Sequence, residues 1–377
     1  MLMQLAINGL LLALLPLALV WTSSDKKKYR KLVWVTLFLT FDLIMFGAFT
    51  RLTDSGLGCP DWPGCYGQAN PWQAQSHIQA AELALPSGPV TFAKAWIEMI
   101  HRYLAMAVGV LCIVLMIAGL RIWHKASSSS IRPSPSLAIA IFFCVCVQGA
   151  FGAWTVTLKL QPLIVTIHLL LGMVLLGLLA WLATRQEQQI VAVAALRIRW
   201  SAAAALILLL IQIGLGGWVS TNYATLACND YPLCHGKLVP SMDLANGFSL
   251  WRDLGKTATG EFLPFPALTA IHWVHRSFAY LVIACIAWVA CRALKIEGLY
   301  KTARALLVLI GVQFLTGVST IFFNWPLAIA VAHNGGAALL LLVLVMLNYK
   351  ANLPRQRHII MQKSHAKIAF HSSCQSE

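Results

Sequence analysis

Nine stretches of roughly 20 mostly apolar residues divide this chain, and each is long enough to cross the hydrocarbon core of a membrane as a helix. Inside lipid a polypeptide must satisfy its own backbone hydrogen bonds, which only helices and closed barrels achieve. The sequence therefore predicts an all-α integral membrane protein. Its expected spans are residues 3–21, 32–50, 96–120, 137–157, 163–183, 201–220, 270–291, 303–323 and 327–347.

Composition and the placement of charge agree with this prediction. Of the 377 residues, 59% are hydrophobic and 11% are charged, against about 25% charged residues in soluble domains. A net charge of +15 is also found in proteins that bind nucleic acid, but here the basic residues gather between alternate spans. By the positive-inside rule these groups are cytoplasmic, so we expect the amino terminus outside and the carboxyl terminus inside. The groups lie within 26–31, 121–132, 185–199, 292–304 and 350–367.

The second half of the chain repeats the first. Gln148, Gly152 and His168 recur 165 positions later, as Gln313, Gly317 and His333. The phrases LGCPDWPGCYG and LACNDYPLCHG are displaced by 169 positions, and EMIHR and HWVHR by 174. Duplication at this scale predicts two pseudo-symmetric four-helix bundles, with one additional span at the amino terminus.

The repeat also predicts the domain boundaries. MLMQLAING has no basic residue ahead of its apolar run and no clear cleavage site follows, so the first span is interpreted as a retained anchor rather than a secretory signal. The expected order is an anchor at 1–31, a bundle at 32–184, a cytoplasmic linker at 185–200, a second bundle at 201–349 and a cytoplasmic tail at 350–377.

Two long connections on the outer side, about 51–95 and 221–269, each carry one Cys-x5-Cys pair. The pairs are Cys59 with Cys65, and Cys228 with Cys234. The outer face of a bacterial-type membrane is oxidising, so both pairs are expected to form short-loop disulfides. A structural staple is the favoured interpretation over a redox-active pair. Metal binding is less favoured, because only His235 lies nearby and the first loop has Tyr66 at that place.

Histidine is rare and costly in membrane helices, so four histidines in the spans are candidates for function. They are His101, His168, His275 and His333, each about six or seven residues into a span that runs inward. At 1.5 Å per residue all four lie about 9–10 Å below the outer surface. Each pair can therefore face across its bundle and provide two axial ligands for haem iron.

Two other interpretations of the histidines are weaker. A single intramembrane histidine usually makes an interhelical hydrogen bond, but four at matched depth favour ligation. A zinc site needs three or four converging ligands rather than two separate pairs. Small residues near the histidines fit either a flat macrocycle or close helix packing. They are Gly149, Gly152, Gly335 and Gly336.

Charged neighbours distinguish the two histidine pairs. Arg102 and Arg276 directly follow a candidate ligand, and each either binds a haem propionate or extends to the membrane surface. Three residues before those ligands the halves differ, with Glu98 in the first and His272 in the second. Glu98 is either an ion-pair partner of Arg102 or Lys94 or a catalytic carboxylate on the face of His101.

Six phrases, taken in order, resemble the haem A synthase family of cytochrome oxidase assembly over residues 32–348. They are GAFTRLTDSGLGCPDWPGCYG (47–67), EMIHR (98–102), VTIHLLLG (165–172), LACNDYPLCHG (226–236), WVHR (273–276) and AHNGG (332–336). The chain departs from that family's pattern in its extra first span and in Asp42, an acidic residue where apolar residues are usual. Neither departure touches the ligand candidates.

The resemblance implies an oxidoreductase that converts the C8 methyl group of haem O into the formyl group of haem A. It implies a haem b cofactor on His275 and His333, substrate haem O at His101 and His168, and Glu98 as the catalytic carboxylate. Haem O synthase and cytochrome c oxidase assembly proteins are the implied partners. The implied location is the inner membrane, with no role for nucleic acid and with the haem sites toward the outer side.

Two alternatives use the same histidines. A di-haem b-type cytochrome, linked to quinol, would transfer electrons without modifying a haem. A non-catalytic assembly factor would store or hand over haem. Neither explains as well why Glu98 stands in one half only or why the cysteine loops recur.

Overall fold

Helices make up the framework of the computed structural model, which describes residues 1–125, 134–187 and 189–373, with side chains described as far as residue 353. Within these residues nine helices are long and apolar enough to cross a membrane, which confirms the predicted nine spans. They are α1 (Leu2–Thr22), α2 (Lys28–Leu52), α4 (Phe92–Lys125), α5 (Ser136–Thr157), α6 (Pro162–Arg185), α7 (Arg199–Thr221), α9 (Phe265–Ala293), α10 (Tyr300–Phe322) and α11 (Leu327–Ser373).

Three short helices lie between the spans. They are α3 (Gln75–Ala84) and α8 (Leu244–Gly247) in the two long loops, and the 3-10 helix η1 (Val193–Ile198) in the expected linker. The tail predicted at 350–377 begins as the continuation of α11 to Ser373. Arg132 of the second basic group and residues 374–377 lie outside the described residues, as do the basic side chains of the tail after residue 353.

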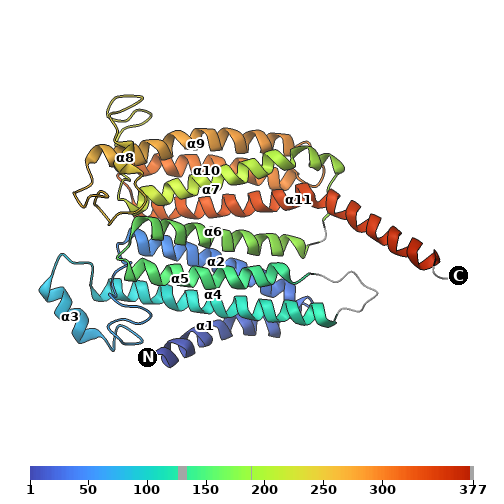
Figure 1. The fold of residues 1–377 in the computed structure, drawn as a ribbon, viewed down its shortest axis with the longest axis horizontal. Helices are drawn as coiled ribbons and strands as arrows, with labels where there is room; N and C mark the ends of the chain where they lie inside the picture. Colours follow the sequence, from blue (N-terminus) through green and yellow to red (C-terminus); the bar gives the residue numbers. More distant parts are fainter. Residues whose placement is uncertain (126–133, 188, 374–377) are drawn as a thin grey trace.

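The long helices form two four-helix groups that lie side by side (Figure 1). In the first group, α4 and α6 each pack against both α2 and α5, so α4 and α6 are diagonal to one another. In the second group, α9 and α11 are diagonal in the same way, between α7 and α10. The helix α1 packs mainly on the outside of α4. The diagonal helices are the four that carry the candidate ligands.

The two groups share one apolar core rather than two separate ones. A single cluster of buried side chains runs from Val20 near the end of α1 to Ala351 in α11. The groups meet where α6 packs against α7 and α11, and where α2 packs against α11. Small residues allow these close approaches, because packing and not hydrophobic exclusion drives helix association in lipid. For example, a Cβ atom built on Gly217 of α7 would lie 2.8 Å from Leu169 of α6.

Matching turns set the register of two ligand helices. The turn from α5 to α6 places Lys159 and Leu160 in the left-handed region, with φ of 51° and 58°. The turn from α10 to α11 places Asn324 and Trp325 there, with φ of 52° and 61°. Left-handed backbone is unfavourable for residues other than glycine, so the same turn at both places indicates that packing around it is conserved between the repeats.

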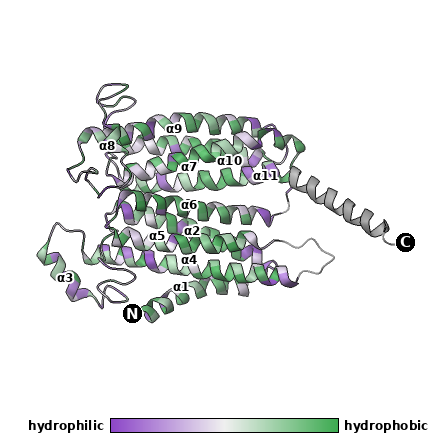
Figure 2. Ribbon diagram, viewed as in Figure 1, coloured by the Kyte–Doolittle hydropathy of each residue, from purple (hydrophilic) through white to green (hydrophobic). Residues whose placement is uncertain are grey.

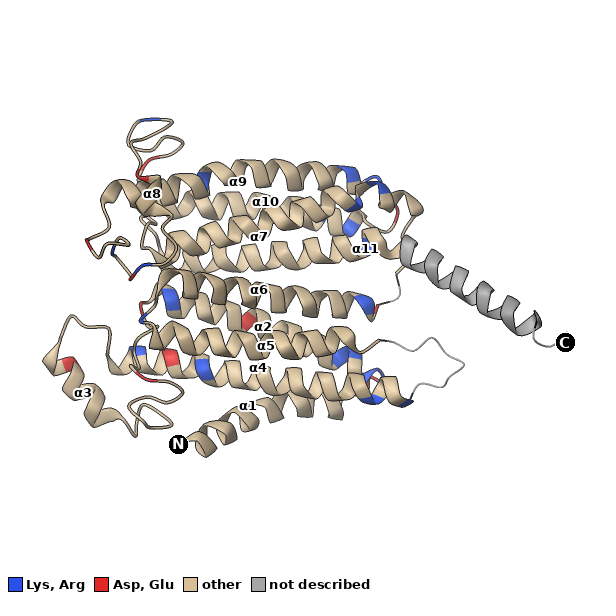
Figure 3. Ribbon diagram, viewed as in Figure 1, with Lys and Arg blue, Asp and Glu red and all other residues tan. Residues whose placement is uncertain are grey.

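The long helices consist mostly of hydrophobic residues along their length (Figure 2). Large apolar side chains are exposed there, including Leu15, Phe38 and Leu315. The described basic groups between alternate spans share the end of the bundle opposite the two cysteine loops (Figure 3). This arrangement is what a multi-pass membrane protein requires; which face of the membrane each end occupies stays a prediction.

We expect the end with the cysteine loops to face the outer side. Alkaline phosphatase, which is active only after export, should be active when inserted after Leu85 and inactive when inserted after Lys295. The reverse pattern of phosphatase activity would contradict the predicted orientation.

Candidate functional site

Each histidine of the first pair lies against a glycine on a neighbouring helix. His101 of α4 faces Gly47 of α2, and His168 of α6 faces Gly152 of α5. A Cβ atom built on Gly47 would lie 3.0 Å from Nε2 of His101, and one on Gly152 would lie 3.1 Å from Cε1 of His168. Only a glycine leaves each ring room in its present position.

The second pair repeats this arrangement. His275 of α9 faces Gly216 of α7, and His333 of α11 faces Gly317 of α10. A Cβ atom built on Gly216 would lie 3.0 Å from Cε1 of His275, and one on Gly317 would lie 3.1 Å from Cε1 of His333. Four imidazoles thus pack on four helix backbones at equivalent places of the repeat.

His101 is a neighbour of His168, and His275 is a neighbour of His333. That each pair ligates a haem iron stays a proposal. Among the described residues, no three His, Cys, Asp or Glu side chains gather as a metal-ion site, which disfavours the zinc interpretation. Two imidazoles on diagonal helices are the donor set of a six-coordinate haem.

A cavity of about 170 Å³ lies between the helices of the second group. His275 and His333 both line it, and its walls are otherwise mostly apolar. Ligand pockets typically have apolar walls and a few convergent polar groups. The polar residues that line it are Gln212, Tyr231, His272, Arg276, Gln313, Thr320 and Asn334. Two imidazoles beside an apolar cavity are a donor set that suits a haem-type group.

Side-chain hydrogen bonds hold the second pair. The amide Nε2 of Gln212 lies 3.1 Å from Nδ1 of His275 and donates to the carbonyl oxygen of His275 at 3.1 Å. The amide Nε2 of Gln313 lies 3.3 Å from Nε2 of His333 and donates to the carbonyl oxygen of His333 at 3.1 Å. The Thr316 hydroxyl lies 2.9 Å from Nδ1 of His333.

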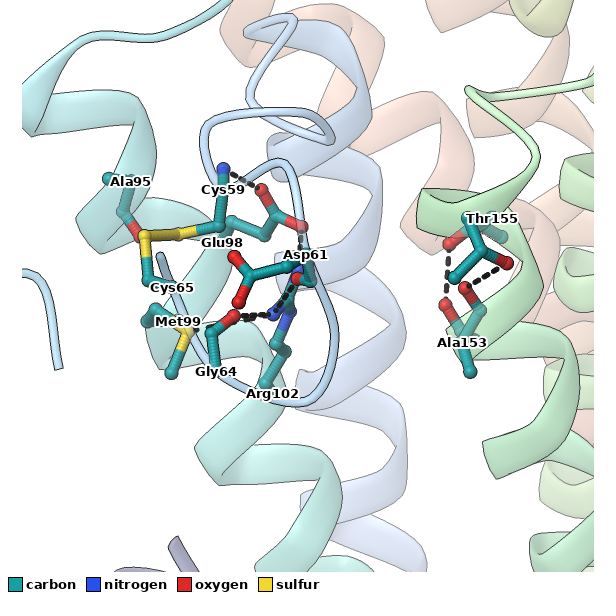
Figure 4. A network of polar contacts seen from close by, with 12 residues as sticks. Cys59, Asp61, Gly64, Cys65, Ala95, Glu98, Met99, Arg102, Ala153 and Thr155 are labelled. Carbon is teal, nitrogen blue, oxygen red and sulfur yellow. Dashed lines mark hydrogen bonds and ion pairs between the residues drawn. A yellow bond between two sulfur atoms is a disulfide. The ribbon is translucent and has the colours of Figure 1, made fainter. Parts of the chain in front are cut away.

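Glu98 joins the helix of His101 to the first cysteine loop (Figure 4). Its carboxylate accepts a hydrogen bond from the backbone N–H of Cys59 at 2.8 Å and forms an ion pair with Arg102. The side chain is buried, being only 4% exposed. Of the ion-pair partners weighed from the sequence, Arg102 is therefore the one in contact. Whether Glu98 is also catalytic stays a proposal.

His272 takes the place of Glu98 in the second half. Its Nδ1 accepts a hydrogen bond from the backbone N–H of Cys228 at 3.2 Å, as Glu98 does from Cys59. His272 also lines the cavity with His275, one turn farther along α9. The equivalent position of Glu98 is therefore at the edge of the first histidine site.

The two arginines bind the loops as well. Arg102 Nη1 donates to the carbonyl oxygen of Asp61 at 2.9 Å, and Arg276 Nη1 donates to that of Asp230 at 3.0 Å. Arg276 also lines the cavity and lies over the ring of Tyr231, 5.3 Å from its centroid. These contacts fix both guanidinium groups, and the propionate role predicted for them stays a proposal.

Both predicted disulfides are present. Cys59 is bonded to Cys65 and Cys228 to Cys234, and the Cα atoms are 4.9 Å apart in each pair. Their sulfur atoms are buried, since all four cysteines are no more than 1% exposed. Burial agrees with the structural interpretation, because thiol exchange needs access to a sulfur atom.

An aspartate organises each disulfide loop. The Asp61 carboxylate accepts hydrogen bonds from the N–H groups of Tyr66 and Gly67 at 2.6 and 2.8 Å. Asp230 makes the same two bonds in the second loop, both at 2.8 Å. These backbone N–H groups hold the pKa of the Asp230 carboxyl below its usual range.

Sequence reasoning missed several residues of the site. Gly47, Gly216, Gln212 and Thr316 were not singled out, although Gln212 precedes Gly216 by four positions, as Gln148 precedes Gly152. That spacing places the amide and the glycine on one helix face and is the signal that identifies them.

Among the glycines that were singled out, only Gly152 faces a histidine. Gly149 has open space where a Cβ atom would stand, whereas Gly335 and Gly336 pack against Met45 and Gln313. Gly335 and Gly336 serve helix packing, because the Met45 and Gln313 side chains occupy the space beside them. Asp42 is exposed on α2 and makes no hydrogen bond or ion pair within the described part of the chain, so the structure assigns it no role.

Comparison with known proteins finds one family over most of the chain. A family model described as cytochrome oxidase assembly protein matches residues 30–345. The chain is 38% identical over 327 residues to a heme A synthase of Shewanella oneidensis, which covers 85% of this chain and 96% of that protein. A heme A synthase of Mesorhizobium japonicum is 32% identical over 334 residues, covering 83% and 87%. One of Erythrobacter litoralis is 28% identical over 333 residues, covering 82% and 93%. The family match includes the four histidines and both disulfide loops but not α1.

We expect Glu98→Ala to destabilise the first loop strongly, by about 3–5 kcal/mol, because it leaves the buried Arg102 without its counter-charge. The midpoint of thermal unfolding and the rate at which a thiol reductant opens Cys59–Cys65 both report this loss. The matched control is His272→Ala, which removes one neutral acceptor from Cys228 and should cost about 1–3 kcal/mol. Equal effects of the two substitutions would contradict the structural role assigned to the ion pair.

Proposed function

Because this chain belongs to the family of cytochrome oxidase assembly proteins, we propose that it synthesises haem A from haem O, as the names of its heme A synthase relatives indicate. The observation that carries the proposal is the repeated site: two histidine pairs, each backed by glycines, on the diagonal helices of two four-helix groups. Two histidine pairs of one design suit an enzyme whose substrate and cofactor are both haems.

The reaction is the oxidation of the C8 methyl group of haem O to a formyl group. This change removes four electrons and adds one oxygen atom. Bound at His275 and His333, haem b would supply one-electron transfer, which is chemistry that no side chain provides. The residues of this chain bind and orient the two haems and keep their reacting edges away from bulk water.

The first histidine pair is the proposed substrate site. His101 and His168 would hold the iron of haem O, and Glu98 would stand as the catalytic carboxylate beside it. Support comes from the asymmetry at one position, since the carboxylate occurs in this half alone and His272 takes its place in the other. A carboxylate at that place can accept a proton from the methyl group or stabilise developing positive charge.

Paired ligands restrict how oxygen reaches the methyl group. With His101 and His168 both bound to the iron, no position remains for molecular oxygen. Either one histidine leaves the iron, or electrons are withdrawn from the macrocycle and water supplies the oxygen atom. In the second route Glu98 takes up the proton that the methyl carbon loses.

The comparisons do not favour the alternatives of a di-haem electron-transfer cytochrome or a haem-handling factor without catalysis, because the curated relatives are named as synthases. The proposed location is the bacterial inner membrane, with the haem sites toward the outer side. Haem O synthase is a proposed partner because it makes the substrate, and cytochrome c oxidase assembly proteins are proposed because they receive the product.

Glu98→His tests the catalytic role with less disturbance than Glu98→Ala. It also removes the counter-charge of Arg102, but it copies the second half of this chain, where His272 and Arg276 bind the loop without a carboxylate. It should keep a hydrogen-bond acceptor for Cys59 and should bind haem O, yet make no haem A. The measurement is the haem composition of cells that also express haem O synthase, with the unchanged chain as the control. Haem A formation by the variant at the normal rate would remove Glu98 from the chemistry.

Ligand substitutions test which half holds haem b. His275→Ala and His333→Ala should each deplete the low-spin haem b absorbance of the purified protein, because one axial ligand is lost. The matched substitutions His101→Ala and His168→Ala should leave that absorbance in place and lower the haem O content instead. An unchanged spectrum in both of the first two variants would refute the assignment.

A further inference from the structure

The two histidine pairs differ in the side chains that support them. In the second half, each imidazole has a polar side chain at Nδ1, which is Gln212 for His275 and Thr316 for His333, at 3.1 and 2.9 Å. Such partners fix the orientation of a ligating imidazole.

Thr316 also ties His333 to the neighbouring helix. Its Oγ1 lies 2.9 Å from the carbonyl oxygen of Val312 and 3.1 Å from that of Gln313, as well as 2.9 Å from Nδ1 of His333. A hydroxyl can donate its one proton and accept another, so this contact orients the imidazole ring in either tautomer.

In the first half, apolar residues occupy the positions equivalent to Gln212 and Thr316. The position equivalent to Thr316, 165 residues earlier, is Phe151. On α2, the residue four positions before Gly47 is Leu43, whereas Gln212 stands four positions before Gly216 on α7. Neither substitute can hydrogen-bond an imidazole.

His168 shows the consequence directly. Its Nδ1 is buried and makes no hydrogen bond of normal geometry within the described part of the chain. The backbone carbonyl of Gln148 lies beside His168, and that of Gln313 lies beside His333. This contact is therefore common to both histidines. The difference is the hydroxyl of Thr316, which the first half lacks.

We propose that Gln212 and Thr316 are positioning residues that make the second haem a permanent one, and that Leu43 and Phe151 make the first haem exchangeable. This inference rests on the proposed function only in that both pairs bind haem. An enzyme that modifies one haem with the help of another must release the first and keep the second. The halves have the same ligands and the same glycine backing, so the surrounding hydrogen bonds are the available means of setting different dissociation rates.

The test is haem transfer from the purified full-length protein, loaded in cells with haem b and haem O, to excess apomyoglobin. Extraction and chromatography identify which haem has left at each time. For the unchanged chain, haem O should leave faster than haem b. Thr316→Val should speed the loss of haem b by about 10-fold to 100-fold, the usual effect of removing a partner from a metal ligand. Gln212→Leu should act in the same direction.

Three further variants separate positioning from general damage. Thr316→Ser keeps the hydroxyl and should retain haem b as the unchanged chain does. Thr184→Val removes a buried hydroxyl that bonds only to its own helix, at Ala180, and should change neither rate. Phe151→Thr supplies the missing hydroxyl in the first half and should slow the loss of haem O, which is a gain that a misfolded protein would not show.

The proposal is overturned if Thr316→Val retains haem b as long as Thr316→Ser does, or if Phe151→Thr leaves the loss of haem O unchanged. These rates are measured without turnover. If the unchanged chain makes no haem A but keeps haem b and exchanges haem O as described, the proposed reaction fails and this inference stands.

Discussion

The contact between an imidazole ring and a glycine of the adjacent helix is the constraint on which the rest of the structure depends. It occurs four times, at equivalent places of the repeat, and in each case a single added carbon atom would crowd the ring. The contact keeps α2 close to α4, α5 to α6, α7 to α9 and α10 to α11. It also holds each histidine against a helix backbone, and in the second group both rings line a cavity between the diagonal helices. Packing in the membrane and ligand binding are thus served by the same residues.

The outer loops are tied to the ligand helices by short connections. Glu98 and His272 each stand three residues before a histidine and accept the N–H of the first cysteine of a disulfide loop. Arg102 and Arg276 each follow that histidine and bind carbonyl groups of the same loop. A disulfide and an aspartate make each loop rigid, so the loop fixes the adjoining end of the helix that carries the histidine. The Glu98 carboxylate stabilises the first cysteine loop, whether or not it also takes part in the reaction. A substitution that keeps the loop intact therefore separates its structural role from a catalytic one.

The two halves share a set of matching contacts and differ in the side chains around them. The ligands, their glycines, the disulfides and the loop aspartates are the same in both halves. The hydrogen bonds to the imidazoles differ between the halves. Thr316 contacts His333 in the second half, and Phe151 occupies the equivalent position in the first. The apolar core nevertheless runs without interruption through both halves. Since they are packed as one body, the halves can differ in how firmly they hold a ligand without differing in fold.

The sequence by itself determined the nine spans and the cysteine pairing, and it predicted the pairing of the four histidines. These follow from local patterns: apolar length, the spacing within one loop, and the displacement between repeats. The tertiary structure alone decided that Glu98 pairs with Arg102 and accepts from Cys59, that Gly47 and Gly216 stand behind the ligands, and that Thr316 but not Phe151 supports one of them. Each of these depends on the rotation of one helix against another. That rotation is set by side-chain packing between segments far apart in the chain, which no local pattern records.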